Sequence, residues 1–271
     1  RYAEELFESK TTKKEILDFI HNYLYVDEYG AESIYEYLWE QHTYAEIPHD
    51  KKIIVEHYDD TKNKYIIFHT LYGRRTNDVL SRALAFVVSK MTGKDVEINI
   101  NDNGFYLLVP RSRNIQISRA FNILKEDNLR EIMKHALDKT EVLGRRFRHC
   151  AARSLMILRN YRGRNKSVSK QQLNSRLLIS AVKRINKDFI ILKEARREVL
   201  EDLMDIAHAE EILKKIEENK IEIKEIYTQI PSPFTFNLIS MDYADIMKME
   251  DKQAFLKNMH NQVLAKISLK K

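Results

Sequence analysis

The residues best suited to chemistry form a run of arginines between positions 145 and 170. If 145–162 is one helix turning about 100° per residue, its cations share one side and Phe147, Ile157, Leu158 and Tyr161 lie on the other. A guanidinium group presents a planar fork of N–H donors that suits phosphate contact and stacking on bases. The run therefore predicts a nucleic-acid interface. The predicted contact residues are Arg145, Arg146, Arg148, His149, Arg153, Arg159, Arg162, Arg164, Lys166 and Lys170.

Charge is distributed very unevenly along the 271 residues, whose net charge is +6. Residues 142–187 contain 13 Lys and Arg and no Asp or Glu, whereas residues 1–60 contain 15 acidic and 6 basic residues, a net of −9. A surface that only needs solvation normally mixes both signs. The basic stretch therefore favours an anionic partner, most simply nucleic acid, over an ordinary basic surface.

A second candidate anion site is the pair Arg74 and Arg75, which follows Gly73 and precedes a predicted helix. Free backbone N–H groups at a helix N-terminus and two guanidinium groups can bind an anion together. The alternative is a turn whose arginines pair with the acidic N-terminal third.

Catalysis has weaker support in the sequence. Cys150 falls on the apolar side of the predicted helix, and its neighbour His149 lies among arginines, which favours a polar contact over a nucleophile and base. The nine His residues show no H-x-x-x-H or H-E-x-x-H spacing, so no metal site is expected. Neither G-x-x-x-x-G-K-[ST] nor G-x-G-x-x-G occurs, so no phosphate-cradling loop and no cofactor are expected in this chain.

The elements that must position these residues are mostly helical, because the chain has only 6 Gly and 4 Pro. Apolar spacing predicts two helices within 4–45, separated at Gly30, and a helix over 77–91 with Asn77 as N-cap. β-Branched and aromatic runs predict a hairpin at 53–68, and alternation predicts strands at 96–100 and 105–109. The fold class is therefore a helix-dominated α+β fold with a small antiparallel β-β-α-β-β module.

The remainder predicts a helical bundle from 115 to 219, a strand at 221–227 and a final helix at 250–267. Its predicted breaks lie near Asp127, Thr140, 163–167, Asp188 and Ala207. The predicted domains are an N-terminal helical segment (1–48), the β-β-α-β-β module (49–110) and a basic helical domain (111–271). Whether the strand at 220–228 returns to the first sheet is left open.

Four ordered motifs resemble the region that follows the motor in Lhr-type (large helicase-related) superfamily 2 helicases, and the resemblance extends over about residues 50–238. The motifs are FHTLYGRRTNDVLSRALA at 68–85, RFRHCAAR at 146–153, LKEARREVLED at 192–202 and PSPF at 231–234, and the first is more similar to the archaeal branch. The resemblance implies a translocase that moves 3′ to 5′ on single-stranded DNA and unwinds duplexes, including RNA–DNA hybrids. It also implies upstream motor domains, which bind ATP and Mg, and a winged helix as partners within one chain, with a role in DNA repair or recombination. It transfers no catalytic residue to this chain.

Three functional hypotheses follow. The first is a non-catalytic domain that contacts single-stranded DNA or an RNA–DNA hybrid. The second is a docking module whose basic face binds an acidic protein surface, and the third is a nuclease or glycosylase using scattered carboxylates.

The sequence also indicates where the protein acts. A single cysteine suits a reducing cytoplasm, and no run of about 18 apolar residues predicts a membrane span. A chain beginning at Arg1 is expected to belong to a longer protein.

The isolated chain is expected neither to bind nor to hydrolyse ATP, because its sequence lacks the glycine-rich loop that holds the phosphates. Phosphate release with and without single-stranded DNA measures this directly. DNA-stimulated ATP hydrolysis by the pure chain would contradict the prediction.

Overall fold

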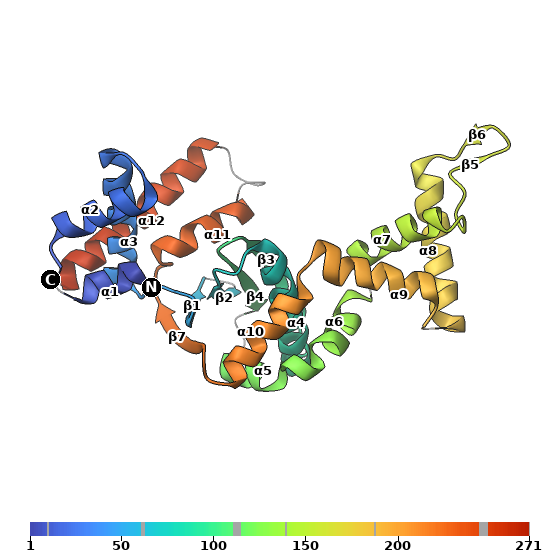
Figure 1. Ribbon diagram of the computed structural model, residues 1–271, viewed down its shortest axis with the longest axis horizontal. Coiled ribbons are helices and arrows are strands. Elements are labelled where there is room, and N and C mark those ends of the chain that lie inside the picture. The colour runs from blue at the N-terminus through green and yellow to red at the C-terminus, as the bar shows by residue number, and fades with distance from the viewer. Residues whose placement is uncertain are drawn as a thin grey trace.

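A mixed sheet of five strands lies at the centre of the molecule, in the order β3-β4-β2-β1-β7 (Figure 1). The computed structural model describes residues 1–9, 11–60, 63–110, 115–138, 140–186, 188–243 and 249–270. The strands are β1 (Lys52–Asp59), β2 (Asn63–His69), β3 (Glu97–Asn101), β4 (Gly104–Pro110) and β7 (Glu222–Thr228). Neighbouring strands are antiparallel except β1 and β7, which are parallel. The predicted hairpin is thus confirmed, and the late strand joins the first sheet beside β1.

Strand β2 is buried on both sides, which explains the apolar run 65–68 at its centre. Ile66 and Phe68 point into the main core, which also contains residues of α4 (Arg74–Thr92). Tyr65 and Ile67 point to the other face, where they pack with residues of α11 (Pro233–Tyr243). Helix α11 was not expected from the sequence, because its apolar residues do not form one stripe of helical period.

Helix α4 begins earlier than predicted, at Arg74 after Gly73, and ends at Thr92, where Gly93 stops it as predicted. Both glycines have positive φ, +82° and +69°, which a residue without Cβ adopts at no steric cost. The prediction of Asn77 as N-cap is wrong. Asn77 is fully buried inside the helix, and its amide donates to the carbonyls of Thr70, Asn101 and Asp102 at 3.0–3.1 Å. It ties the start of α4 to two loops.

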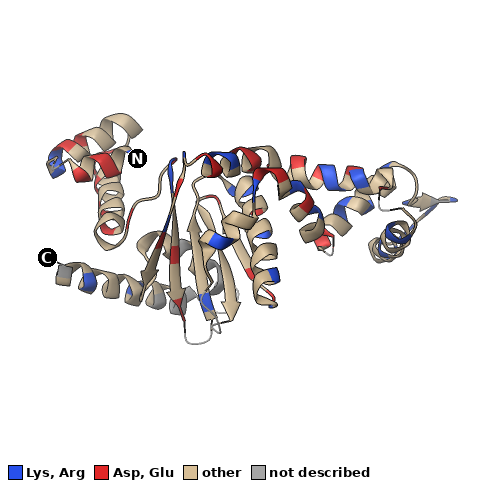
Figure 2. Cartoon of the chain, turned by 90° about the horizontal axis from the view of Figure 1, so that it is seen from below, with Lys and Arg blue, Asp and Glu red and all other residues tan. Residues whose placement is uncertain are grey.

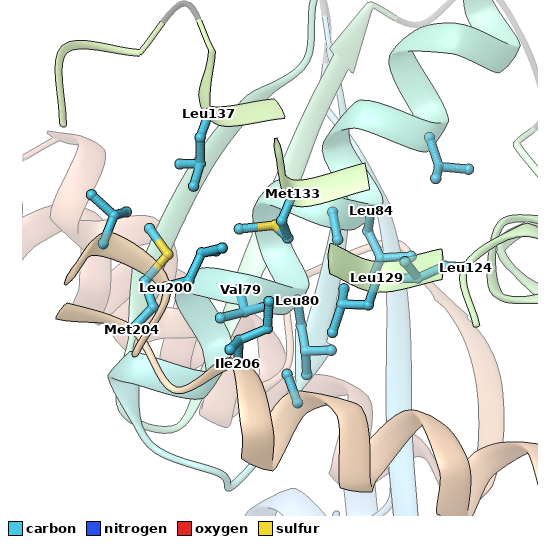
Figure 3. Close-up of a cluster of buried hydrophobic side chains, with 14 of the residues drawn as sticks. Val79, Leu80, Leu84, Leu124, Leu129, Met133, Leu137, Leu200, Met204 and Ile206 are labelled. Carbon is cyan, nitrogen blue, oxygen red and sulfur yellow. The ribbon is translucent and has the colours of Figure 1, made fainter. Parts of the chain in front are cut away.

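The main core continues from the sheet through α4 into a layer of helices (Figure 3). This layer contains α5 (Ile117–Ile123), a 3₁₀ turn (Glu126–Asn128), α6 (Leu129–Leu137) and α10 (Ile206–Glu217). The buried side chains labelled there are Val79, Leu80, Leu84, Leu124, Leu129, Met133, Leu137, Leu200, Met204 and Ile206. They fill the space between α4 and the segments that lead into and out of the basic region.

The N-terminal segment forms three helices, not two: α1 (Tyr2–Glu8), α2 (Lys13–Leu24) and α3 (Glu28–Tyr44). Gly30 lies inside α3, and the break falls at Tyr25, whose φ is +54°, because Asp27 caps α3 by accepting a bond from the N–H of Gly30 at 2.7 Å. The last helix, α12 (Met249–Lys270), packs beside α3. The two ends of the chain therefore meet at one end of the molecule (Figure 1).

A helical arm projects from the other end of the molecule (Figure 1). It consists of α7 (Glu141–Arg153), the short strands β5 (Asn160–Tyr161) and β6 (Arg164–Asn165), α8 (Val168–Ile185), α9 (Ile190–Arg197) and a π-helical turn (Glu198–Leu203). Figure 2 shows acidic residues on the N-terminal helices and basic residues at the far end of this arm.

The domain boundaries at residues 48 and 110 stay predictions. Among the described helices, none is both long and apolar enough to cross a bilayer.

A buried carboxylate, Glu56 on β1, fastens the second face of the sheet. Its side chain is fully buried and accepts bonds from Thr228 Oγ1 at 2.8 Å, Ser232 N at 2.8 Å and Thr235 Oγ1 at 2.7 Å. His69 Nε2 on β2 lies 3.1 Å away. Burial opposes ionisation of Glu56, but His69 and the hydroxyls of Ser232 and Thr235 together hold its pKa below the ordinary value.

Replacement of Glu56 by Ala is expected to lower the free energy of unfolding by about 3–5 kcal/mol, because several buried donors lose their acceptor. Glu222→Ala, on an exposed site of β7, is the matched control and should change it by less than about 0.5 kcal/mol. Urea unfolding at neutral pH measures both.

The same carboxylate predicts a pH dependence. Because the pKa of Glu56 is lowered in the folded state from an ordinary value of 4.5, its stabilisation is complete above that value and is lost as the pH falls through the folded pKa. The wild type should therefore lose more stability on acidification than Glu56→Gln. Parallel stability curves for the two proteins would refute this role.

Candidate nucleic-acid interface

Helix α7 contains the first part of the predicted run of basic contact residues, which extends from Arg145 to Lys170. Thr140 caps its start by accepting a bond from the N–H of Leu143 at 3.4 Å. Leu143, Phe147 and Cys150 are buried in the main core, which continues into α9. The predicted apolar side of the helix is therefore confirmed for this segment.

The prediction of one helix through residue 162 is wrong. The helix ends at Arg153, and Leu155 has a φ of +60°, which a helix cannot contain. Ile157 is nevertheless buried at 4 % exposure, because the chain folds back after the helix rather than continuing it. The predicted strip is thus divided between a helix and the hairpin that follows.

A cleft of about 810 Å³ lies between α7 and α8. Arg145 and Arg148 line it from α7, and Arg176 lines it from α8. No ion pair joins these three guanidinium groups to another described side chain. Gln172 and Ser180 add polar groups to the same wall. The structure therefore brings together two predicted contact residues and one, Arg176, that the prediction did not include.

The fourth cation of this cleft, Lys183, is already paired with a carboxylate. Its ammonium lies 3.6 Å from Asp138 Oδ1, and Arg196 donates to the same oxygen at 2.8 Å. Burial opposes ionisation of Asp138, but these two cations hold its pKa below the ordinary value. Lys183 is therefore less available to an anion than the three arginines.

Two predicted contact residues instead bind a carboxylate of the protein. Glu198, the first residue of the π-helical turn, is 4 % exposed and pairs with Arg153 and, at 3.5 Å, with Arg146. A buried carboxylate cancels much of the field of a guanidinium beside it. Arg146 and Arg153 consequently fasten α7 to the end of α9. The charge run in the sequence could not show this, because Glu198 lies 45 residues beyond Arg153.

His149 lies partly buried on α7 among arginines. Burial lowers its pKa, and the positive charges of Arg148, Arg146, Arg159 and Arg153 lower it further. The imidazole is therefore neutral at pH 7 and can serve as a polar contact but adds no charge.

The remaining predicted residues lie at the tip of the arm. Arg162 and Gly163 form the turn between β5 and β6, with φ values of +51° and +73°. Arg159 and Arg164 are exposed beside this turn. Lys166 donates its backbone N–H to the carbonyl of Arg159 at 2.8 Å, and the N–H of Lys170 donates to the Ser167 hydroxyl that caps α8.

In the predicted second anion site, the side chain of Arg75 is bound to the protein's own backbone. Arg75 Nη2 donates to the carbonyls of Glu201 at 2.8 Å, Asp202 at 3.2 Å and Met204 at 2.9 Å. These carbonyls end the π-helical turn and have no partner within it. Arg74 is exposed, and only its backbone N–H makes a described bond, to Asp102 Oδ1 at 3.3 Å. The two neighbours therefore have different roles.

The described residues contain no group of three or more His, Cys, Asp and Glu side chains placed to hold a metal ion. Cys150 is buried, and burial raises the pKa of its thiol, so it lacks the character of an activated nucleophile.

The family model described as DEAD/H associated matches residues 47–235, and the chain belongs to this family.

The relatives are named Lhr helicases. The ATP-dependent helicase Lhr-Core of Methanothermobacter thermautotrophicus is 47 % identical over 262 residues, which cover 96 % of this chain and 30 % of the relative. The protein of the same name from Saccharolobus solfataricus is 41 % identical over 271 residues, covering 97 % of this chain and 31 % of the relative. The chain thus spans about a third of the length of these relatives.

A solved structure also matches the chain. It is that of the Mycobacterium smegmatis helicase Lhr bound to ssDNA and AMP-PNP, with a TM-score of 0.75, 26 % sequence identity, and coverage of 88 % of this chain and 30 % of that one. The helix-dominated α+β fold and the resemblance to Lhr-type helicases are both confirmed.

Replacement of Arg75 by Ala should lower the free energy of unfolding by about 1–3 kcal/mol, because three helix-end carbonyls lose their donor. Arg74→Ala is the matched control on the adjacent residue and should change it by less than about 0.5 kcal/mol. Denaturant unfolding of both variants measures the difference, and equal effects would contradict the assignment.

Proposed function

We propose that this chain is the non-catalytic domain of an ATP-dependent helicase that contacts nucleic acid through the cleft between α7 and α8. The observation that carries the proposal is the convergence of Arg145, Arg148 and Arg176 on one cleft, where none of the three forms an ion pair with a described side chain although Asp138 and Glu141 also line the cleft. Guanidinium groups free of internal partners can bind phosphate without first breaking an ion pair.

The names of the relatives support the helicase part of the proposal, and the ssDNA in the M. smegmatis structure supports a single strand as ligand. In this proposal the parent protein moves 3′ to 5′ on DNA, also unwinds RNA–DNA hybrids, and serves DNA repair or recombination. Motor domains and a winged helix in the same polypeptide supply ATP and Mg chemistry, and this domain holds the strand beside them.

The cleft suits the backbone of a strand better than its bases. Its lining combines guanidinium, amide and hydroxyl groups with the ammonium of Lys183, the carboxylates of Asp138 and Glu141 and the aliphatic side chain of Ile179, and the lining residues include no aromatic ring. Base stacking on aromatic rings is the usual way to hold single-stranded bases. Contact through phosphates gives weak sequence preference and strong dependence on salt.

Replacing Arg145 and Arg148 together by Ala should reduce the slope of log K against log salt by about 1.4, because each single-strand phosphate contact contributes about 0.7. Adding Arg176→Ala should bring the loss to about 2. Fluorescence anisotropy with a labelled oligonucleotide over a salt series measures the slope.

Arg146→Ala with Arg153→Ala is the matched control, because it removes two arginines from the same helix. Both are already paired with the one carboxylate of Glu198, so they are less available to phosphate than the cleft arginines, and the slope should change by less than it does in the Arg145 and Arg148 variant. Circular dichroism at the assay temperature verifies that each variant is folded. If the Arg146 and Arg153 variant reduces the salt slope more than the Arg145 and Arg148 variant does, the wrong face of the helix has been assigned.

If neither set of substitutions changes binding although the wild type binds, the interface lies elsewhere. If the wild type binds no oligonucleotide at low salt, the function fails and the basic arm is better explained as a docking surface for an acidic protein.

A further inference from the structure

The tip of the arm is a two-stranded hairpin that neither the core nor the proposed cleft requires. Asn160 pairs with Asn165 and Tyr161 with Arg164 across the ribbon. The bond from the N–H of Lys166 to the carbonyl of Arg159, 2.8 Å long, extends the pairing. The hairpin lies at the far end of the molecule from the sheet (Figure 1).

The turn gives the ribbon a defined twist. Both central residues, Arg162 and Gly163, have positive φ, as in the type I′ turn whose twist matches that of the flanking strands. Asn165 and Arg164 are therefore presented on a regular ribbon rather than on an irregular loop.

The exposed groups of the ribbon are those that read nucleic-acid bases and phosphates. Residues directly opposite each other on a hairpin share one face, so Asn160 and Asn165 lie together on one side, and both are exposed. A carboxamide can bind the edge of adenine through two hydrogen bonds in the major groove. Arg159 and Arg164, both exposed, can contact adjacent phosphates or guanine.

A ribbon of this kind fits a groove and not a single strand. The major groove of B-form DNA is about 12 Å wide and admits a two-stranded β-ribbon, whereas the major groove of an A-form duplex is too narrow for side chains to read. An exposed ribbon face made of amides and guanidinium groups is also unlike the apolar centre of a protein–protein interface.

We infer that the hairpin 159–166 is a second nucleic-acid contact, which enters the major groove of duplex DNA with Asn160 and Asn165 on base edges. The inference rests on the proposed function and adds a substrate class to it. The α7–α8 cleft holds a single strand by its phosphates, while the tip of the same arm contacts duplex.

The test compares three labelled probes of one A·T-containing sequence of about 20 nucleotides, namely the DNA duplex, its single strand and the RNA–DNA hybrid. Asn160→Ala with Asn165→Ala preserves the net charge and the turn. It should weaken duplex binding about tenfold and change single-strand binding less than about twofold. The wild type should bind the DNA duplex more tightly than the hybrid.

Asn122→Ala, an exposed asparagine on α5, is the matched control and should change none of the three affinities. Arg145→Ala with Arg148→Ala should weaken single-strand binding, which separates the cleft from the hairpin. Thermal unfolding checks each variant, and Asn165→Ala alone is used if the double variant is unfolded.

Equal losses on duplex and single strand, or no loss on duplex, would overturn the hairpin assignment and leave the cleft standing. Wild-type binding to single strand but not to duplex would do the same. Binding to none of the probes would overturn the proposed function, and the hairpin inference with it.

Discussion

The buried carboxylate of Glu56 links the three segments that complete the sheet and cover its second face. A charge that is removed from water must be fully hydrogen-bonded, or it costs several kcal/mol. Glu56 meets this requirement with donors from β2, from β7 and from the turn that opens α11. Those donors come from segments far apart in the sequence, so the carboxylate is satisfied only when β7 has returned to β1 and α11 covers the sheet.

The return of β7 in turn fixes both ends of the arm. The chain leaves the sheet after β4, runs outward along α7, turns through the hairpin and α8, and comes back along α9 to α10 and β7 (Figure 1). Glu198 then holds α7 to the end of α9 through Arg146 and Arg153, and Arg75 holds the end of the same turn to α4. Arginines with internal partners thus build the arm, whereas the three cleft arginines have no ion pair with any described side chain.

Much of this architecture could be predicted from the sequence, because local signals determine it. The hairpin β1–β2, the strands β3 and β4 and the stop at Gly93 follow from alternation and glycine geometry. The two-stranded hairpin at 160–165 was missed because a basic run of helical period masked its Arg-Gly turn. Asn77 was misassigned because a polar residue near a helix start resembles a cap, and only the folded loops reveal its buried role.

The candidate site was predicted less completely, because electrostatic pairing over long sequence distances has no local signature. The positions of Arg145 and Arg148 on one helix face follow from the helical period. The pairing of Arg153 with Glu198, and the approach of Arg176 from a second helix, depend on how α7, α8 and α9 pack. A count of basic residues therefore overstates the number of cations available to a ligand.

The separation of charge along the molecule has a kinetic consequence. Residues 1–60 have a net charge of −9 and lie mostly at one end, whereas the stretch 142–187, with 13 Lys and Arg, forms the arm at the other (Figure 2). Such a chain has a large electric dipole along its long axis. Near a polyanion the field turns the arm forward and repels the opposite end, so that encounters begin in one orientation. Salt screens this field beyond a Debye length of about 8 Å at physiological ionic strength. The field therefore orients the molecule only in the last few ångströms before contact and does not attract it from far away.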